Sequence, residues 1–203
     1  PVWPTPKDGG GKTLTEASAK VELLGAGVNV PASMLVNKID QLETALDQLA
    51  APYVLKGQGW AHKTEAGAVA LGLDDAAAVI AAAEDMARQN AAPDGYLVEE
   101  MIGIPLAELL IGVVADPAHG FVLTIGAGGI MTELIEDHVS LILPISEDDV
   151  RLALGQLAIA ALFDGFRGKP PADKKAVIDV VMAIQSYVRT HRSSMKELEI
   201  NPL

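Results

Sequence analysis

The sequence of 203 residues contains no cysteine, which excludes disulfide scaffolds, thiolate zinc sites, iron–sulfur clusters and cysteine nucleophiles. Only 4% of the residues are aromatic, so a stacking platform for single-stranded nucleic acid is not expected. Basic residues are also scarce, since 15 Lys and Arg stand against 27 Asp and Glu and the formal net charge is −12. This balance argues against DNA or RNA as the main partner. A nucleotide remains an expected kind of ligand, because a metal ion and a few local cations suffice to bind its phosphates.

Long apolar segments and a secretory signal are absent as well. The stretch Ile104–Ala115 is interrupted by Glu108, and no window reaches the length of about eighteen apolar residues that a membrane span requires. The segment Pro1–Pro6 is rich in proline, and no basic region followed by an apolar one succeeds it. Together with the lack of cysteine, these features lead us to expect a cytoplasmic protein without a membrane partner.

What is present is a globular composition, with half of the residues hydrophobic. Residues 1–12 are expected to form a tail or linker, because their prolines and Asp8–Gly11 favour extended and turn conformations. From Thr13 onward the hydrophobic periodicity predicts alternating elements. The expected helices are Thr13–Leu24, Lys38–Leu49, Glu147–Phe163, Ala172–Arg189, and an alanine-rich helix that Asp74 or Asp75 caps and that runs to about Asn90. The expected strands are Ser33–Val36, Ala51–Lys56, Ala68–Leu73, Tyr96–Met101, Glu108–Ala115, Phe121–Ile125 and Leu198–Ile200. Because residues 96–126 contain no helix, a mixed α/β (α+β) fold with antiparallel pairing is predicted.

Two candidate functional residues follow one another in the first half of the chain. Lys56 ends an apolar strand just before a glycine-bearing loop, where an ammonium group can bind phosphate as a point charge. A solvated lysine at a strand end is the commoner explanation of that position taken alone. His62 lies in the loop, and a neutral imidazole is a competent phosphoryl nucleophile near pH 7. Most histidines in surface loops have no such role.

Acidic residues gather at two other strand ends. Glu99 and Glu100 are neighbours on a strand and must point to opposite faces. One of them can therefore face a cleft while the other is solvated. The alternative is that both are solvated side chains at the edge of a sheet, without a role in binding. Glu197, Glu199 and Asn201 share one face at a period of two. Two carboxylates and an amide oxygen form a hard-oxygen site suited to magnesium, and a plain polar strand face is the alternative.

Taken together, these segments resemble the ATP-grasp module of nucleoside-diphosphate-forming acyl-CoA synthetases, a group that includes ADP-forming acetate–CoA ligases and relatives of the succinyl-CoA synthetase β subunit. The resemblance runs in order from about residue 13 to residue 203. The matching segments are Leu14–Glu16 with Lys20 and Leu24, Gly27–Pro31, Val54–Lys56, His62–Val69, Val98–Met101, Glu108 with Ile111–Val113, Asp116, Pro117 and Gly120, Gly126–Gly129 with Glu133 and Asp137, Phe166–Gly168 with Pro170 and Pro171, and Glu197–Leu203.

The resemblance implies an ATP-grasp fold over residues 13–203, with two lobes and the nucleotide bound between them. The smaller lobe is expected at about 40–95, and the larger lobe at 13–39 plus 96–203. The implied activity is transfer of a phosphoryl group between ATP or ADP with Mg²⁺ and a histidine carrier, during interconversion of acyl-CoA and carboxylate. Such an enzyme is an acid–thiol ligase, of which this chain is one part.

The resemblance also implies a role for each candidate residue. Lys56 would contact the nucleotide phosphates, and Asn201 with Glu199 would bind magnesium. Glu199 would also lie near the phosphohistidine during transfer, and His62 would act as a phosphate carrier. The remaining nucleotide-binding residues implied in this way are Glu99, Glu100, Met101 and Glu108.

Two departures and two alternatives accompany this interpretation. Gln58–Trp60 and Gly67-Ala68 differ from the pattern that flanks the histidine in many relatives, and a second metal carboxylate is expected beyond Leu203. The CoA-binding and phosphohistidine domains are expected in the same gene product or in a separate subunit, and the complete enzyme is expected to be an oligomer. The alternatives are a carboxylate–amine ligase of the ATP-grasp type, which would not need His62, and a non-catalytic nucleotide-sensing module fused to another activity such as an acetyltransferase.

Overall fold

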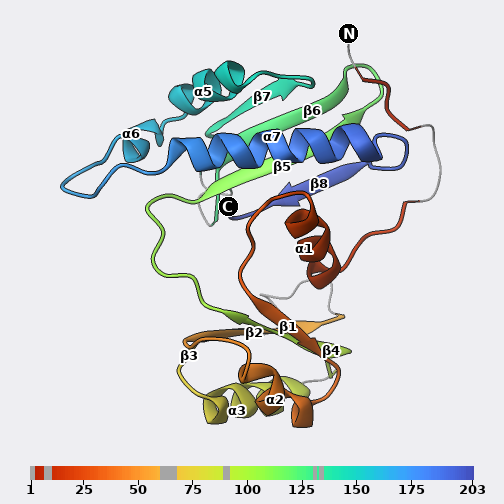
Figure 1. Cartoon of the computed structure of the whole chain (residues 1–203), viewed down its shortest axis with the longest axis vertical. Helices are drawn as coiled ribbons and strands as arrows, with labels where there is room; N and C mark the ends of the chain where they lie inside the picture. Colours follow the sequence, from red (N-terminus) through yellow and green to blue (C-terminus); the bar gives the residue numbers. More distant parts are fainter. Residues whose placement is uncertain (1–2, 7–10, 60–67, 89–91, 130–131, 133–134) are drawn as a thin grey trace. The chain divides into compact units, whose positions relative to one another are not determined.

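The computed structural model describes residues 3–6, 11–59, 68–88, 92–129, 132 and 135–203. The chain forms two compact units, each built on an antiparallel sheet of four strands (Figure 1). The smaller unit consists of Glu16–Lys20 and Asn29–Gly103, and the larger unit consists of Pro1–Thr15, Val21–Val28 and Ile104–Leu203. The helix α1 (Glu16–Gly25) therefore has residues in both units. The predicted mixed α/β class with antiparallel pairing is confirmed.

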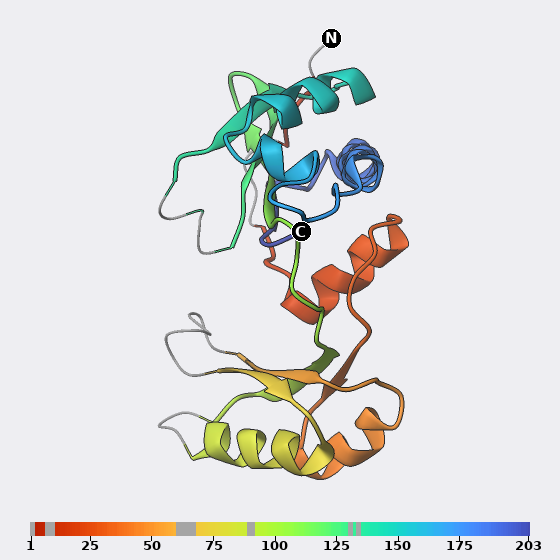
Figure 2. The ribbon, with the colours of Figure 1, turned by 90° about the vertical axis from the view of Figure 1, so that its left-hand side faces the viewer.

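The sheet of the smaller unit has the strand order β1-β4-β2-β3. These strands are β1 (Ser33–Val36), β2 (Tyr53–Gln58), β3 (Val69–Leu73) and β4 (Gly95–Glu100). One face of the sheet is covered by the short η1 (Ile39–Gln41), α2 (Leu42–Leu46) and α3 (Ala76–Ala87). Figure 2 shows α2 and α3 on the same side of this sheet. The opposite face of the sheet carries neither of these helices.

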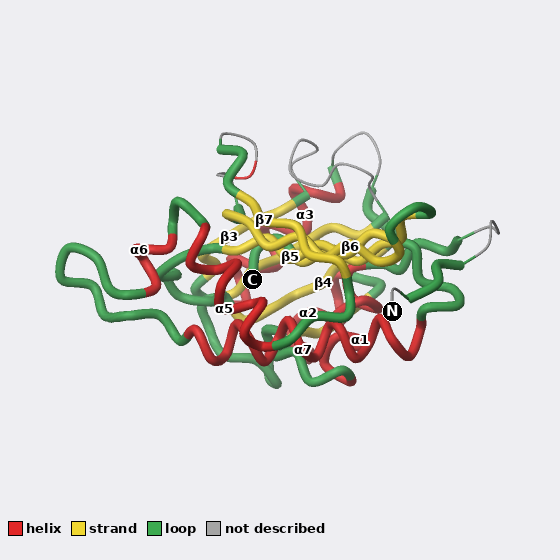
Figure 3. Tube along the Cα trace, turned by 90° about the horizontal axis from the view of Figure 1, so that it is seen from above, coloured by secondary structure: helices red, strands yellow, loops and turns green. Residues whose placement is uncertain are grey.

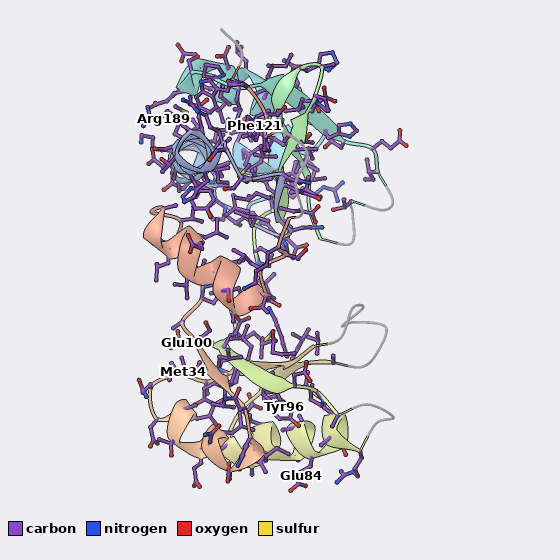
Figure 4. All side chains as sticks on the ribbon, turned by 90° about the vertical axis from the view of Figure 1, so that its right-hand side faces the viewer. Met34, Glu84, Tyr96, Glu100, Phe121 and Arg189 are labelled. Atoms are coloured by element: carbon purple, nitrogen blue, oxygen red, sulfur yellow. The ribbon has the colours of Figure 1, made fainter. Side chains whose placement is uncertain are left out.

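Local sequence explains how α3 is fixed to its sheet. The Asp75 carboxylate caps the helix by accepting the Ala78 N–H at 2.8 Å. Val79, Ala83 and Met86 follow at helical spacing and are buried in the core. The Tyr96 hydroxyl donates to the Ala83 carbonyl at 3.2 Å, and Figure 4 shows Tyr96 between β4 and the helices. The covered face is thus both apolar and tied by a hydrogen bond.

The sheet of the larger unit has the strand order β7-β6-β5-β8. Its strands are β5 (Leu109–Asp116), β6 (Gly120–Ala127), β7 (His138–Ile142) and β8 (Glu197–Ile200), and its helices are α5 (Glu147–Gln156), α6 (Ala160–Phe163) and α7 (Lys174–His191). The longest of the described helices is α7, drawn in red in Figure 3. Its residues Ile178, Val181, Ile184 and Val188 are buried against the core. Phe121 of β6, labelled in Figure 4, is fully buried in the same core.

Several predicted bounds were wrong. The expected helix Lys38–Leu49 is split into η1 and α2, and the expected helix Glu147–Phe163 is interrupted after Gln156. Leu157 is extended, and the N–H groups of Ala158 and Ile159 donate to the Asp137 carboxylate at 2.7 and 3.2 Å. These two N–H groups therefore bond to a distant side chain instead of continuing the helix.

The edge strand β7 was not predicted from the sequence. It joins β6 in regular register, with Thr124 opposite Ser140. Its residues alternate between exposed and half-buried, so it lacks the strong apolar alternation by which strands are found. The hairpin of β5 and β6 was predicted and is confirmed.

The smaller unit also reaches further than the expected lobe of about 40–95. It begins at Asn29 and ends at Gly103, apart from Glu16–Lys20. The reason is that β1 pairs along its whole length with β4, with Ser33 opposite Glu99 and Val36 opposite Tyr96. Among the helices of the described ranges, none is long and apolar enough to cross a membrane.

Candidate functional site

Lys56 and Glu99 lie on the face of the smaller sheet opposite α2 and α3. Strands β2 and β4 pair so that Val54 is opposite Glu99. Lys56, two residues after Val54, therefore shares the face of Glu99. The alternating residues Leu55 and Val98 belong to the core under the helices. The Lys56 Nζ lies 2.7 Å from Glu99 Oε2, so the two predicted residues are brought into direct contact.

Helix α1 adds two further charges to this pair. Glu16 Oε1 lies 2.5 Å from Lys56 Nζ, and Lys20 Nζ lies 3.1 Å from the same carboxylate, one helical turn away. Lys20 also forms an ion pair with Glu99. The four ion pairs form a closed cycle in which positive and negative side chains alternate. This cycle, the charge ring, consists of Lys20, Glu16, Lys56 and Glu99. All four residues belong to the smaller unit.

Burial is unequal around the charge ring. The Glu99 side chain is only 4% exposed, whereas Lys20, Lys56 and Glu16 are 17%, 21% and 29% exposed. Burial by itself would lower the pKa of Lys56, but its hydrogen bonds to Glu16 and Glu99 and their negative charges outweigh that effect and raise the pKa. Lys56 therefore stays positively charged throughout the physiological range.

Glu100 and Met101 follow directly on the same strand. Glu100 points to the face opposite Glu99, which confirms the prediction that the two carboxylates diverge. Its Oε1 accepts the Ala50 N–H at 2.8 Å, so the carboxylate has a protein partner. The Met101 N–H donates to the Pro52 carbonyl at 2.8 Å, while the Met101 side chain is 38% exposed. The backbone of this segment is therefore tied to the start of β2.

A second group of predicted residues gathers in the larger unit. On β8, Leu198 and Ile200 pack against the core, and Glu197 and Glu199 point to the uncovered face. Just beyond the strand, Asn201 Oδ1 accepts the Gly129 N–H at 2.8 Å. The Asn201 side chain therefore joins the end of β8 to Gly128-Gly129, the glycine turn that follows β6.

Glu108 approaches the same glycine turn from the start of β5. Its carbonyl accepts the Gly128 N–H at 2.8 Å. A Cβ added to Gly129 would lie 1.9 Å from Glu108 Oε2, and the Gly129 φ of +62° favours glycine as well. Close approach and backbone conformation together explain why glycine stands at this position.

The uncovered face of the larger sheet carries a hollow beside these residues. Register places Glu199, Gly112, Thr124 and Ser140 in one row across the four strands. The Thr124 and Ser140 hydroxyls are 3.1 Å apart and line a pocket of about 400 Å³, together with His138. The absence of a side chain at Gly112 leaves the row open between Glu199 and Thr124.

The oxygen donors suit magnesium without forming a complete cage. In the ranges that the structure describes, no group of three or more His, Cys, Asp or Glu side chains is placed to hold a metal ion. The Asn201 amide oxygen and the exposed Glu199 carboxylate are nevertheless hard ligands. Magnesium is commonly held by one or two protein oxygens, with phosphate and water completing the shell. The donor set therefore fits a shared, phosphate-dependent ion.

His62 lies outside the described residues, as does the whole of 60–67. Glu16 and Lys20 were not among the predicted site residues, although both lie in a segment that carries the family resemblance. Their i,i+4 spacing on a helix was a signal that they act as a pair, but nothing local pointed to Lys56 and Glu99 as partners.

Comparison with known proteins identifies the family of this chain. Residues 6–203 match the family profile described as an ATP-grasp domain. The chain belongs to this family. The ATP-grasp fold that was expected from the sequence is thereby confirmed, and two antiparallel sheets are what the structure contains.

Among curated relatives, this ATP-grasp chain is 29% identical to the β subunit of ADP-forming acetate–CoA ligase II of Pyrococcus furiosus, covering 96% of the chain and 85% of the relative. It is also 29% identical to an ADP-forming acetate–CoA ligase of Methanocaldococcus jannaschii, covering 93% of the chain but only 28% of the relative. A trans-feruloyl-CoA synthase is 31% identical, with 94% and 28% covered. The chain thus corresponds to most of a separate subunit and to about a quarter of longer relatives.

Solved structures show the same relationship. An acetyl-coenzyme A synthetase of Ca. Korarchaeum cryptofilum, in complex with coenzyme A and Ca-AMPCP, superposes with a TM-score of 0.83 at 28% identity, covering 93% of this chain and 85% of that chain. Another structure of that synthetase, with coenzyme A and Mg-AMPPCP, has its phosphohistidine segment pointing towards the nucleotide-binding site, and superposes with a TM-score of 0.79 at 26% identity, covering 92% of this chain and 83% of that chain.

Proposed function

We propose that this ATP-grasp chain is the nucleotide-binding part of an ADP-forming acyl-CoA synthetase. It would transfer a phosphoryl group between ATP or ADP and a histidine, in the service of acyl-CoA plus ADP plus phosphate ⇌ carboxylate plus CoA plus ATP. The observation that carries the proposal is the similarity to a β subunit of an acetate–CoA ligase over 96% of the chain. The nucleotide analogues bound by the Korarchaeum relative support the same ligand class.

The charge ring supports a role for Lys56 in holding nucleotide phosphates. Phosphoryl transfer depends mainly on positioning and on neutralisation of phosphate charge. Lys56 offers a partly exposed ammonium whose pKa is raised. In the proposal, Glu99, Glu100 and Met101 bind the adenine and ribose end, and their fixed backbone supplies the rigidity that such recognition needs.

The proposed magnesium ligands are Asn201 and Glu199, and Glu108 is proposed to contact the nucleotide beside the glycine turn. Bound magnesium would supply neutralisation of phosphate charge. Asn201 is already oriented by the Gly129 N–H at 2.8 Å, which leaves a second lone pair of its amide oxygen for an ion. Glu199 would also lie near the phosphohistidine during transfer.

His62 is proposed as the phosphate carrier on this chain. Its neutral imidazole nitrogen would form a bond to the γ-phosphorus, while the bond from that phosphorus to the β,γ-bridging oxygen breaks and ADP leaves. Rapid-quench labelling of the complete enzyme with γ-³²P-ATP tests this role. We expect an acid-labile, base-stable label on this chain that disappears in His62→Asn, with nucleotide binding preserved. A label confined to another domain, together with normal turnover in His62→Asn, would refute it.

The remaining chemistry is proposed to reside outside this chain. CoA-binding and phosphohistidine domains are proposed as partners, fused or in a separate subunit of an oligomeric enzyme, since the relatives occur both as a β subunit and as longer chains. A cytoplasmic location belongs to the same proposal and fits the absence of cysteine. We expect no acyl-CoA formation when the purified 203-residue chain receives ATP, CoA, magnesium and acetate. Steady formation of acyl-CoA from that mixture would contradict the proposal that the CoA-binding and phosphohistidine domains lie outside this chain.

A further inference from the structure

We propose that Glu16 and Lys20 of α1 are positioning residues that tune nucleotide binding in opposite directions. Lys20 would neutralise Glu99 and so leave Lys56 available for phosphate. Glu16 would be a displaceable counter-ion that competes with phosphate for Lys56. The inference rests on the proposed function, because it takes Lys56 as the phosphate-binding cation.

Glu99 is the most buried member of the charge ring. A buried carboxylate needs compensating charge, and Glu99 receives it from both Lys20 and Lys56. Together these three groups carry a net charge of +1. Without Lys20 the sum falls to zero, and Lys56 becomes the only lysine of the ring paired with Glu99. Lys20 therefore maintains the positive balance that a phosphate requires.

Glu16 is the most exposed member of the charge ring. Its carboxylate lies 2.5 Å from Lys56 Nζ and 3.1 Å from Lys20 Nζ, and it brings the ring to zero net charge. Each ammonium has three N–H donors, and in the ring each lysine faces the same two carboxylates. A phosphate that approaches Lys56 must use the third donor or replace one carboxylate. Returning Glu16 to water costs less than uncovering Glu99, because Glu16 is 29% exposed and Glu99 only 4%.

Opposite effects of two substitutions test the proposal. In the complete enzyme we would measure the Kd for ATP and for AMP by isothermal titration calorimetry, with magnesium, in wild type, Glu16→Gln, Lys20→Met and Lys20→Arg. We expect Glu16→Gln to lower the Kd for ATP by about threefold to tenfold, and Lys20→Met to raise it by about tenfold. Lys20→Arg should restore binding to within about threefold of wild type, and all effects should be smaller for AMP, which carries less negative charge.

A matched pair on α7 supplies the controls. Lys175 and Asp179 form an i,i+4 ion pair with side chains 65% and 57% exposed. Lys175→Met and Asp179→Asn make the same net charge changes as the test variants and should leave the Kd for ATP within about twofold of wild type, because exposed pairs are weak and screened.

The outcomes separate this inference from the proposed function. If the wild-type enzyme binds neither ATP nor ADP, the proposed function fails. If the wild type binds ATP but Glu16→Gln binds it equally or more weakly, or Lys20→Met binds it unchanged, the inference fails and the function stands. Tighter binding by Glu16→Gln cannot arise from damage to the fold, so that variant keeps the test decisive even if thermal melting shows Lys20→Met to be unfolded.

Discussion

Replacing Glu99 by glutamine is expected to destabilise the protein by about 2 kcal/mol. The carboxylate is 4% exposed and pairs with Lys56 Nζ at 2.7 Å and with Lys20. Removing one partner of a fully buried ion pair costs about 3–5 kcal/mol, because the other charge is left uncompensated. Here both lysines retain Glu16 and part of their exposure, and glutamine keeps one acceptor oxygen. The loss should therefore be close to that of one hydrogen bond to a charged group, about 1.5–3 kcal/mol.

The assay is urea unfolding at pH 7, with Glu100→Gln as the matched control. Glu100 follows Glu99 on β4, points to the opposite face, and accepts one N–H from Ala50 at 2.8 Å, a bond that glutamine also accepts. Its substitution should cost less than about 1 kcal/mol. If Glu99→Gln is no more destabilising than Glu100→Gln, or is stabilising, desolvation of the buried carboxylate exceeds the gain from its two ion pairs, and the reasoning is refuted.

The remaining predictions concern the glycine turn and a helix cap. Gly128→Ala would place a Cβ 2.6 Å from the Leu109 carbonyl oxygen and should cost about 1–3 kcal/mol in urea unfolding, whereas Gly112→Ala, whose Cβ meets only a side-chain carbon at 3.9 Å, should cost less than about 1 kcal/mol. Equal losses would refute that steric argument. The Ser146 hydroxyl caps α5 by accepting the Asp149 N–H. Ser146→Ala removes this cap and should cost about 1 kcal/mol in the same assay. An unchanged free energy of unfolding would show that the cap does not stabilise the protein. The N–H and hydroxyl of Ser146 hold the pKa of Asp149 below its usual value, so the stabilisation is complete at neutral pH and is lost as the pH falls through that lowered pKa. Asp149→Asn should lose less stability than wild type between pH 7 and pH 2, and an unchanged acid profile would contradict this.

Much of the candidate site followed from local periodicity. The two-residue repeat of a strand is enough to predict that Glu99 and Glu100 diverge and that Glu197 and Glu199 share a face, and the register confirms both. The hairpin of β5 and β6 was also predictable, because two apolar runs flank a short turn. These features depend only on residues that are close together in the chain, so they can be predicted from the sequence alone.

Contacts between residues far apart in the chain are set by the tertiary fold. The sequence alone indicates that Lys56 lies in a strand and that Glu16 and Lys20 are one turn apart on a helix, although β2 continues past the predicted end at Lys56 to Gln58. Only the fold brings those three residues together with Glu99, because ion-pair partners separated by up to 79 positions are chosen by strand pairing and helix placement. In the same way, Asp137 interrupts a helical pattern 21 residues away by accepting the Ala158 N–H. Local propensity is a weak preference that a single well-placed acceptor can override, and no sequence pattern reveals where that acceptor will lie.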